Sequence, residues 1–529
     1  MPTVASRPRV GLAQVVVGLF LVVLAVYTLS APGRIDIIDG QLRYDVTESL
    51  LTLGQPVLRD PALVGLGIPG PSGLVYAFYN AAPSVVAMPL VWVGGLVSDP
   101  TGEVRRFLFS LTSGIFGALV AALLCIFYVA LGVAPTAAVW WSLVSAFATL
   151  LWPLSTSTFD QAQHAFFALL AVFLGWLAAQ RRSVVLAAVG GLIAGVLINY
   201  QESYVLVLPT LAISTLTPGG QSGKRDRTAR FLVFLLASCV GFGLWLLFNQ
   251  LRFQHPLISG KSAILERVAI PSFGNPLIGL LGLLVSPGKG VLFYSPPVIL
   301  AALGMPSLYR RDAWLGRTVV ATTGVYVAFI ASLSFFGGDW GWGPRYLVTI
   351  LPLWALALPF VPPTMIRRSI AGMVVAMGLV VQLLALSVDH QRFFFERALP
   401  DFFWAQDRWF YFRESALLAR PAEIVASLRE GRPQEARFFA PGPYRDAATY
   451  AIFGFARRTQ APRLMRRYEV FYLPRPWPLW MAWIAPERRP IRMAPVVVGT
   501  LGIGLVGTAL VLGGLRRGSR SSSGERSLP

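Results

Sequence analysis

The stretch 11–29, GLAQVVVGLFLVVLAVYTL, is an unbroken apolar run that follows Arg7 and Arg9. A helix of this length crosses the ~30 Å hydrocarbon core of a bilayer. The run exceeds the ~7 to 15 apolar residues of a signal peptide, and the one cleavage-like position, near Ser30, is poor. We therefore expect a membrane anchor that stays in the chain, with the N-terminus in the cytoplasm.

The composition of the whole chain agrees with a membrane protein. Of the 529 residues, 55% are hydrophobic and only 13% are charged, which is outside the range of soluble domains. The net charge of +20 does not indicate nucleic acid, because many of the cations flank apolar runs, as the positive-inside rule requires. Cys125 and Cys239 each lie in an apolar run, so neither indicates a disulfide or a metal site.

Twelve apolar runs are candidate membrane spans. They lie at 11–29, 107–131, 136–154, 162–180, 183–198, 203–217, 231–249, 290–307, 316–336, 346–363, 369–388 and 494–514. With a cytoplasmic N-terminus, the Arg-rich and Lys-rich turns between these runs all fall on the inner side. We expect both termini to be cytoplasmic, in the inner membrane of a bacterium.

Two further apolar segments are ambiguous. Residues 81–98 could form a thirteenth span, but this would place the later basic turns outside. We therefore expect a helix in the outer interface, with Arg105 and Arg106 opening the next span. Residues 275–286 are more consistent with a re-entrant or interfacial piece than with a crossing.

The predicted fold is an all-α polytopic membrane protein. A transmembrane module covers 1–388 and includes a large first outer loop, 30–106, which carries interfacial helices. Residues 389–493 form an outer region, rich in Arg and aromatic residues, whose fold the sequence does not indicate. The last span at 494–514 is followed by a basic cytoplasmic tail, 515–529, that we expect to be disordered.

Four carboxylates follow the first span, in RIDIIDGQLRYDVTESLL at residues 34–51: Asp36, Asp39, Asp45 and Glu48. The helical pattern of residues 43–53 places Asp45 and Glu48 on one face, with Asp36 and Asp39 before the helix. Carboxylates just above the bilayer can meet both lipid and water, which suits catalysis. Any one of them can instead be a helix cap or a contact to a lipid headgroup.

A second acidic position follows the third span, in LWPLSTSTFDQAQH at residues 151–164. Asp160 lies there with Gln163 and His164. Taken alone, Asp160 suits the N-cap of the next helix, as does Thr158. His164 lies within the first turns of that span, where a polar side chain faces protein or water rather than lipid.

Cations for an anionic ligand come from two outer turns. SPGKGVLFYSPP at residues 286–297 contains Lys289, with Tyr294 on the following span. GGDWGWGPRYL at residues 337–347 contains Arg345, beside Asp339 and interfacial tryptophans. Arg345 can snorkel to headgroups, but its place on the outer side, against the prevailing charge bias, also suits a bidentate grip on phosphate.

Four segments together resemble bacterial GT-C glycosyltransferases, a group similar to protein O-mannosyltransferases and the lipid A aminoarabinose transferase. They are IIDGQLRYDVTESLLTLGQPVL (37–58), STSTFDQ (155–161), SPGKGVLFYSP (286–296) and WGWGPRYLVTILP (340–352). The resemblance covers most of residues 10–390 in order, and its specificity comes from the set rather than from any one motif.

The resemblance implies an inverting transfer of a sugar from a polyprenyl-phosphate carrier to a hydroxyl of a glycan, lipid or protein at the outer membrane face. It makes Asp39 the general base, with Asp36 second. Where many relatives carry an Asp-Glu pair, this chain has Asp39-Gly40. We expect a substrate-binding set, listed here: Asp160, His164, Lys289, Tyr294, Arg345 and Glu48. The acidic cluster could hold a divalent cation, but no spacing requires one.

Other functions are compatible with a polytopic chain. A transporter or flippase of lipid-linked sugars or small solutes is the main alternative. Carriers tend to have repeated halves and ionisable groups near the midplane, whereas here the carboxylates lie at outer ends of spans and no repeat is visible. A polysaccharide polymerase or ligase would share the lipid-phosphate substrate, and a non-catalytic scaffold is the least supported alternative.

Overall fold

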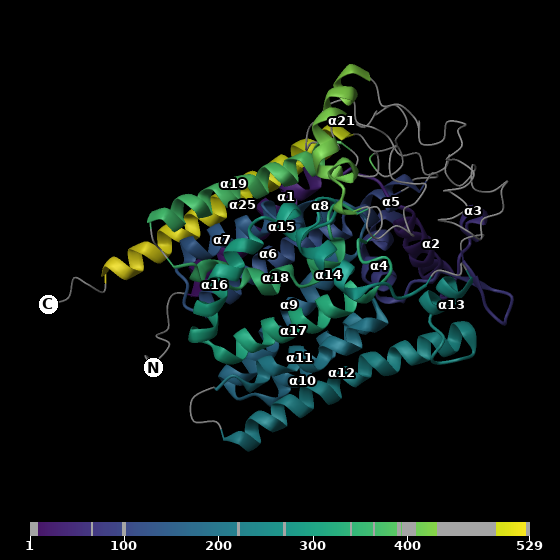
Figure 1. Cartoon of the computed structure of the whole chain (residues 1–529), viewed down its shortest axis with the longest axis horizontal. Coiled ribbons are helices and arrows are strands. Elements are labelled where there is room, and N and C mark those ends of the chain that lie inside the picture. Colours follow the sequence, from purple (N-terminus) through teal and green to yellow (C-terminus); the bar gives the residue numbers. More distant parts are fainter. Residues whose placement is uncertain are drawn as a thin grey trace.

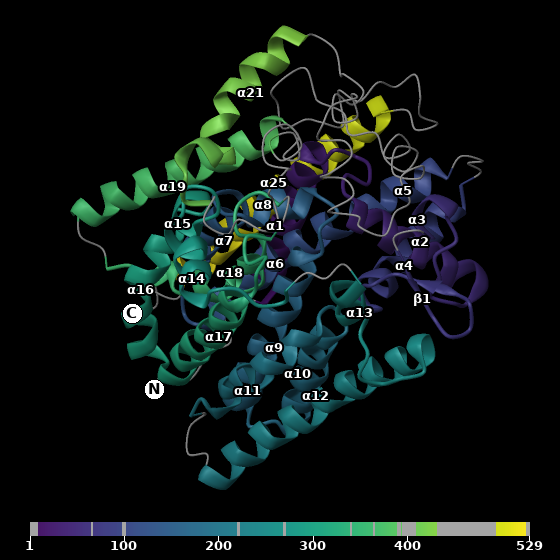
Figure 2. The same ribbon diagram turned by 45° about the vertical axis from the view of Figure 1, so that its right-hand side comes forward.

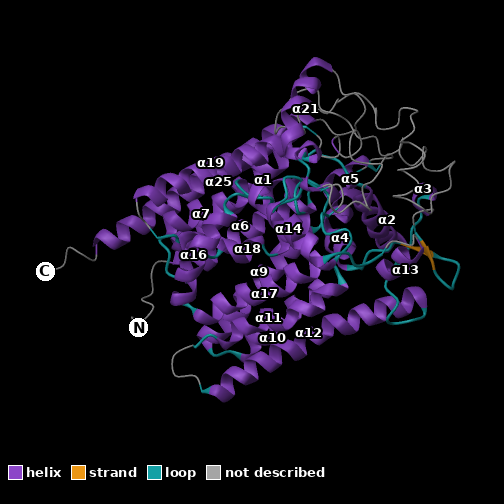
Figure 3. Cartoon of the chain, viewed as in Figure 1, coloured by secondary structure: helices purple, strands orange, loops and turns teal. Residues whose placement is uncertain are grey.

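The structure is a computed structural model that describes residues 9–64, 67–97, 102–218, 223–267, 271–338, 341–362, 365–388, 393, 409–430 and 493–524. These residues are mainly helical (Figure 3). Their only sheet is an antiparallel pair in the first outer loop, β1 (Ile68–Pro69) and β2 (Val75–Tyr76). The expected all-α class is confirmed.

Seven helical segments in the described residues are long and apolar enough to cross a membrane, and each coincides with an expected span. They are α1 (Arg9–Ser30), α5 with α6 (Glu103–Ser110, Thr112–Ala130), α9 (Gln161–Arg181), α12 (Lys224–Phe253), α17 (Ala313–Ser332), α19 (Met365–Ser387) and α25 (Met493–Gly524). The chain is therefore a polytopic membrane protein.

The other five expected spans are short or broken, so the total of twelve stays a prediction. They comprise α7 (Pro135–Phe147) with α8 (Leu151–Thr156), α10 (Val184–Ile198), η1 (Glu202–Val207) with α11 (Leu208–Ala212) and η2 (Ile213–Leu216), α15 (Val291–Tyr294) with α16 (Val298–Arg311), and η3 (Arg345–Thr349) with α18 (Leu351–Ala355) and η4 (Leu358–Phe360).

Prolines explain several of the breaks. Pro209 and Pro352 lie in the first turns of α11 and α18, and Pro297 precedes α16. Each interrupts the helix before it, because proline lacks the amide donor that a continuous helix needs. Irregular backbone at membrane depth is tolerated only where protein surrounds it. Every residue of α8 and of α18 is buried, as this requires.

The first outer loop packs at one end of the bundle (Figure 1). It contains α2 (Ile38–Leu53), α3 (Pro61–Val64) and α4 (Ala82–Gly95), and α13 (Gly260–Arg267) lies against it, whereas α14 (Pro276–Val285) packs on α17. Helix α4 packs on α2 and α5 and exposes Val85, Trp92 and Val93. Its position in the outer interface stays a prediction, and α14, with 10 residues, is too short to cross.

The first and last helices of the described chain lie side by side, as both views show (Figures 1 and 2). Glycines permit this contact: a Cβ at Gly18 would lie 2.5 Å from the Gly507 carbonyl oxygen. Helix α25 continues to Gly524, into the tail that we expected to be disordered, while 525–529 lie outside the described residues.

Of the outer region 389–493, the structure describes residue 393 and residues 409–430. The second stretch contains η8 (Phe412–Glu414) and α21 (Ala416–Glu430). The remainder of our expectation for 389–493 falls outside the described residues.

We predict that Gly507→Ala lowers the melting temperature of the detergent-solubilised protein. The new Cβ would lie 2.8 Å from the Gly18 carbonyl oxygen and 2.9 Å from the Val22 amide, so α1 and α25 must separate. Overpacking of this kind costs about 1–3 kcal/mol. Gly513→Ala, on the same helix with open space around residue 513, is the matched control. Equal melting temperatures for the two variants would contradict the prediction.

Candidate functional site

The site forms where the start of α2 meets the segment before α9. Helix α2 begins at Ile38, so Asp39 lies in its first turn. We had expected Asp39 to precede the helix. Gly40 allows the approach, because a Cβ at this position would overlap the Thr158 side chain. The close contact with Thr158 therefore explains the glycine at position 40. Asp39 and Arg43, one turn apart, share the side of α2 that faces the segment.

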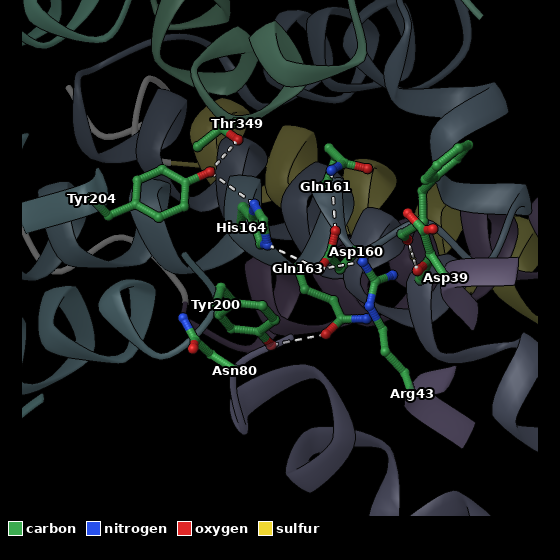
Figure 4. Close-up of polar contacts among 12 residues, drawn as sticks. Asp39, Arg43, Asn80, Asp160, Gln161, Gln163, His164, Tyr200, Tyr204 and Thr349 are labelled. Atoms are coloured by element: carbon green, nitrogen blue, oxygen red, sulfur yellow. Dashed lines mark hydrogen bonds and ion pairs between the residues drawn. The ribbon is translucent and has the colours of Figure 1, made fainter. Parts of the chain in front are cut away.

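Asp160 is the centre of a buried polar network (Figure 4). Its Oδ2 lies 3.1 Å from Arg43 Nη2 and 3.4 Å from His164 Nε2, and its Oδ1 accepts from Gln161 Nε2 at 3.1 Å. Arg43 also donates to the Thr158 carbonyl oxygen at 3.3 Å. Asp160 occupies the N-cap position of α9, but its side chain makes no cap hydrogen bond. The ion pairs, and not the cap alternative, therefore explain this carboxylate.

The charges around Asp160 decide its protonation. Burial alone would raise the pKa of the carboxyl, but the positive charge of Arg43, with a contribution from His164, outweighs burial and holds that pKa well below its ordinary value of 3.8. Asp160 is therefore an anion at neutral pH, and its poor proton affinity makes it unsuited to general base catalysis.

Asp39 pairs with a different arginine. Its Oδ2 lies 3.8 Å from Arg345 Nη1, and the Arg345 guanidinium stands 4.4 Å from the centre of the Phe159 ring. The Asp39 side chain is 19% exposed, against 6% for Arg345 and 6% for Asp160. Of the acids in this cluster, Asp39 is thus the one that solvent or a substrate can reach.

Tyr79 joins the two ion pairs. Its pKa is raised well above 10.0 by burial, and the charge of Asp39 and a hydrogen bond with that carboxylate raise it further. The Arg43 guanidinium lies over the Tyr79 ring at 4.3 Å. Arg252 positions the loop by donating from Nη1 to the Ala77 and Tyr79 carbonyl oxygens, each at 2.9 Å. A neutral phenol is therefore held beside Asp39.

Asp36 is a structural neighbour of the cluster. Its Oδ1 accepts from the Thr158 amide at 2.9 Å and from Thr158 Oγ1 at 2.5 Å. It does not cap α2, whose N-cap is Ile37. Asp36 is buried and joins the end of α1 to the segment that carries Asp160.

His164 connects the cluster to the interior of the bundle. Its Nδ1 lies 2.8 Å from the Tyr204 hydroxyl, which lies 2.8 Å from Thr349 Oγ1 (Figure 4). Thr349 belongs to η3, the element that begins at Arg345. The chain of contacts therefore ties the position of Arg345 to that of Asp160.

The structure places Lys289 and Tyr294 behind the site. Lys289 is fully buried, and its Nζ donates to the carbonyl oxygens of Gly341 (2.7 Å) and Gly343 (3.3 Å). It therefore supports the turn that carries Arg345. Tyr294 is also buried, packs on Trp342 and accepts a hydrogen bond from the Leu417 amide. Both residues therefore pack against the turn that carries Arg345, and the ligand contacts that we expected of them stay a prediction.

Glu48 lies apart from the cluster. It pairs with Arg105 at 3.1 Å and lines a separate cavity of about 420 Å³ together with Asp45. Asp339 and Trp340, singled out beside Arg345, lie outside the described residues. Within the described part of the chain, no group of three or more His, Cys, Asp or Glu side chains could hold a metal ion.

Sequence reasoning missed Arg43 and Tyr79, and it considered Thr158 only as a helix cap. Arg43 had a usable signal, because it follows Asp39 by one helical turn. Tyr79 and Thr158 had none, since the contacts that position them join segments more than 30 residues apart.

Among known proteins, only solved structures match this chain. No family model matches the chain, and no curated protein matches its sequence. The apo oligosaccharyltransferase of Archaeoglobus fulgidus aligns at 12% identity and a TM-score of 0.42 over 76% of this chain and 60% of that enzyme. Its complex with an inhibitory peptide and dolichol-phosphate aligns at 13% identity and a TM-score of 0.40, over 74% and 59%.

The chain thus spans less than two thirds of the enzymes it matches. At this identity and TM-score, the alignments do not show the function of this chain.

We predict that Asp160→Asn destabilises the protein by about 3–5 kcal/mol, because it leaves the buried Arg43 charge uncompensated. The melting temperature in detergent measures this. A lowered carboxyl pKa stabilises the fold above the unfolded pKa and loses this effect as pH falls toward the folded pKa. The difference from wild type should therefore be constant above pH 3.8 and narrow below it.

Glu103→Gln is the control for Asp160→Asn, because Glu103 pairs with Arg106 at the surface, with its side chain 33% exposed. Exposed pairs contribute about 1 kcal/mol or less. A loss no greater for Asp160→Asn than for Glu103→Gln would show that the buried pair does not hold the fold.

Proposed function

We propose that the protein is a membrane glycosyltransferase that moves a sugar from a polyprenyl-phosphate donor to an acceptor hydroxyl, with Asp39 as general base. The observation that carries the proposal is the pairing of a reachable carboxylate with a buried arginine: Asp39 is 19% exposed and Arg345 6% exposed. Transfer to a hydroxyl from a lipid phosphate needs a base for the acceptor's proton and a cation for the leaving anion, and Asp39 and Arg345 can supply the two.

The general base must be a carboxylate that can take a proton. A sugar or serine hydroxyl is a weak nucleophile until a base within hydrogen-bond reach removes its proton. Asp160 is unsuited because ion pairs hold its pKa low, and Asp36 is occupied by Thr158. Asp39 is in contact with Arg345 at a longer distance, 3.8 Å, and is the more exposed.

Arg345 is suited to the leaving phosphate. A buried guanidinium can donate two parallel hydrogen bonds to phosphate oxygens, and in a partly dry site these strengthen as charge develops. Gly338 and Gly341 wrap the Arg345 side chain so closely that a Cβ at either position would lie 2.6 or 2.7 Å from it. Together with Lys289, they fix the guanidinium before the donor binds.

The proposed reaction conserves atoms and charge. The acceptor oxygen loses its proton to Asp39 and forms a bond to the anomeric carbon from the side opposite the phosphate. The bond between that carbon and the phosphate oxygen breaks, and the polyprenyl phosphate leaves with the electron pair beside Arg345. Attack from the opposite side inverts the anomeric configuration. A donor with a long prenyl tail also accounts for an enzyme built into the bilayer.

The acceptor in this proposal is a hydroxyl of a glycan, lipid or protein, and the site faces the outer side of the bacterial cytoplasmic membrane. The chain's basic turns support this orientation under the positive-inside rule.

Asp39→Asn is expected to abolish transfer while leaving insertion and folding intact, because the amide keeps the shape of the side chain and cannot accept the proton. Release of polyprenyl phosphate from a panel of polyprenyl-phosphate sugars, with purified protein, measures this. We expect a loss of at least about 10²–10⁴-fold in kcat. Glu48→Gln, which lies in the separate cavity, is the matched control and should retain activity.

Wild-type turnover by Asp39→Asn would remove Asp39 from the mechanism. Movement of intact lipid-linked sugar between leaflets by the wild type, without sugar release, would instead identify a flippase.

Arg345→Lys is expected to lower kcat by about 10–100-fold, because a lysine keeps one charge but loses the planar pair of donors. The same donor assay measures it, with the KM for the donor determined alongside. Arg310→Lys, at an exposed position in the last turn of α16, is the control. An unchanged kcat in Arg345→Lys would mean that the guanidinium does not stabilise the leaving phosphate.

A further inference from the structure

A second polar cavity lies at the first outer loop and is independent of the proposed catalytic site. Its volume is about 420 Å³. Six charged residues line it: Asp45, Glu48, Asp60, Arg59, Arg105 and Arg106. Three are acidic and three are basic, so the wall has no net charge but presents both signs.

The cavity lies on the other side of α2 from Asp39. Glu48 follows Asp39 by nine residues, or about 2.5 helical turns, which places the two carboxylates on opposite faces. The Asp39 face packs on the segment that carries Asp160, whereas the Glu48 face packs toward α5. A ligand in the cavity is thus separated from the catalytic carboxylate by the helix itself.

The acidic wall uses only part of its hydrogen-bonding capacity. Glu48 accepts from the Tyr44 hydroxyl and from Arg105 through the same oxygen, Oε1. Asp45 accepts from the Arg59 and Asp60 amides, at 2.7 and 3.2 Å, through Oδ2 alone. In the contacts of the described residues, each carboxylate therefore keeps its second oxygen for another donor.

The buried acid would gain from a cation. Burial raises the pKa of the Asp45 carboxyl, against the effect of the two backbone hydrogen bonds. A positively charged group at the second oxygen of Asp45 would offset the cost of burying that charge.

The arginines of the cavity also use only part of their hydrogen-bonding capacity, and glycines make room for Arg105. Arg105 spends Nη1 on Glu48, and its guanidinium runs over Gly95, where a Cβ would lie 3.0 Å from Nη2. Arg59 spends Nη1 on Thr52 Oγ1 at 2.8 Å. Both guanidinium groups are substantially exposed and retain donors for an anion.

The cavity also borders an apolar surface. Gly94 of α4 packs directly on the Arg105 backbone, and the C-terminal part of α4 exposes Trp92 and Val93, followed by the exposed Leu96. Arg105 stands at the start of α5, which opens a candidate membrane span. A tryptophan beside arginines at the end of a span is typical of the depth at which lipid headgroups lie.

We propose that this cavity binds a phosphate that carries an ammonium group, as in the headgroup of phosphatidylethanolamine or in free phosphoethanolamine. Arg105 and Arg59 hold the phosphate, and the second oxygens of Glu48 and Asp45 accept from the ammonium. A lipid bound in this way lays its acyl chains along α4. A plain anion would leave the second oxygens of Glu48 and Asp45 without a donor, and a neutral sugar would bring no charge to either wall of the cavity.

The test uses the full chain, purified in detergent, with short-chain phosphatidylethanolamine, phosphatidylcholine and phosphatidylglycerol. Native mass spectrometry measures the apparent affinity for each. Phosphatidylethanolamine should bind at least about ten-fold more tightly than the other two, because choline cannot donate to a carboxylate and glycerol carries no charge. Free phosphoethanolamine should displace it, whereas inorganic phosphate should not.

Two variants locate the binding. Glu48→Gln and Arg105→Gln should each weaken phosphatidylethanolamine binding by about ten-fold or more. Glu103→Gln, an acid on α5 that is not among the cavity's lining residues, should leave it unchanged. Melting temperatures of the variants establish that they are folded, and the lipid discrimination of the wild type decides the matter if they are not.

Equal binding of the three lipids by the wild type would overturn the proposal, as would unchanged phosphatidylethanolamine binding in both folded variants. Binding of phosphoethanolamine without the lipid would support the same chemistry with a soluble source. Glycosyl transfer is assayed separately and does not enter the outcome.

Discussion

A buried ion pair between Arg43 and Asp160 is the constraint around which this end of the bundle is organised. Removing two charges from water is costly, so the pair is stable only if further hydrogen bonds satisfy both partners. Arg43 receives its further contact from the Thr158 carbonyl, distant in the chain, and Asp160 receives its own from Gln161 and His164, which follow it on α9. Helix α2 and the start of α9 can therefore occupy only one relative position.

That fixed position has a consequence for Asp39. Asp39 lies one turn before Arg43 on α2, so its place in space follows from the buried pair, although it is not part of it. The two carboxylates also differ in role, since the low pKa of Asp160 keeps it a structural anion. The chain thus builds a rigid ionic support and leaves a more exposed carboxylate beside it.

Much of the fold could be predicted from the sequence, because lipid requires long apolar helices and the run at 11–29 or 494–514 has few other uses. The broken spans were less predictable, since Pro209 and Pro352 interrupt helices whose apolar composition alone suggests continuity. At the site, short motifs located Asp39, Asp160 and Arg345 but could not say which acid pairs with which base. That depends on contacts between residues more than 100 positions apart, which no local pattern encodes.

Residues 409–415 contact the loop around Lys289, which packs behind the turn that carries Arg345. The Trp409 carbonyl accepts from the Gly288 amide, Ser415 Oγ donates to the Pro287 carbonyl, and the ring of Trp409 lies 5.1 Å from Lys289 Nζ. Lys289, which the sequence singled out for its charge, is thereby packed against a segment more than 100 positions later in the chain. Removing residues 409–415 would therefore take away contacts of the loop around Lys289, and with them part of the packing behind the turn that carries Arg345.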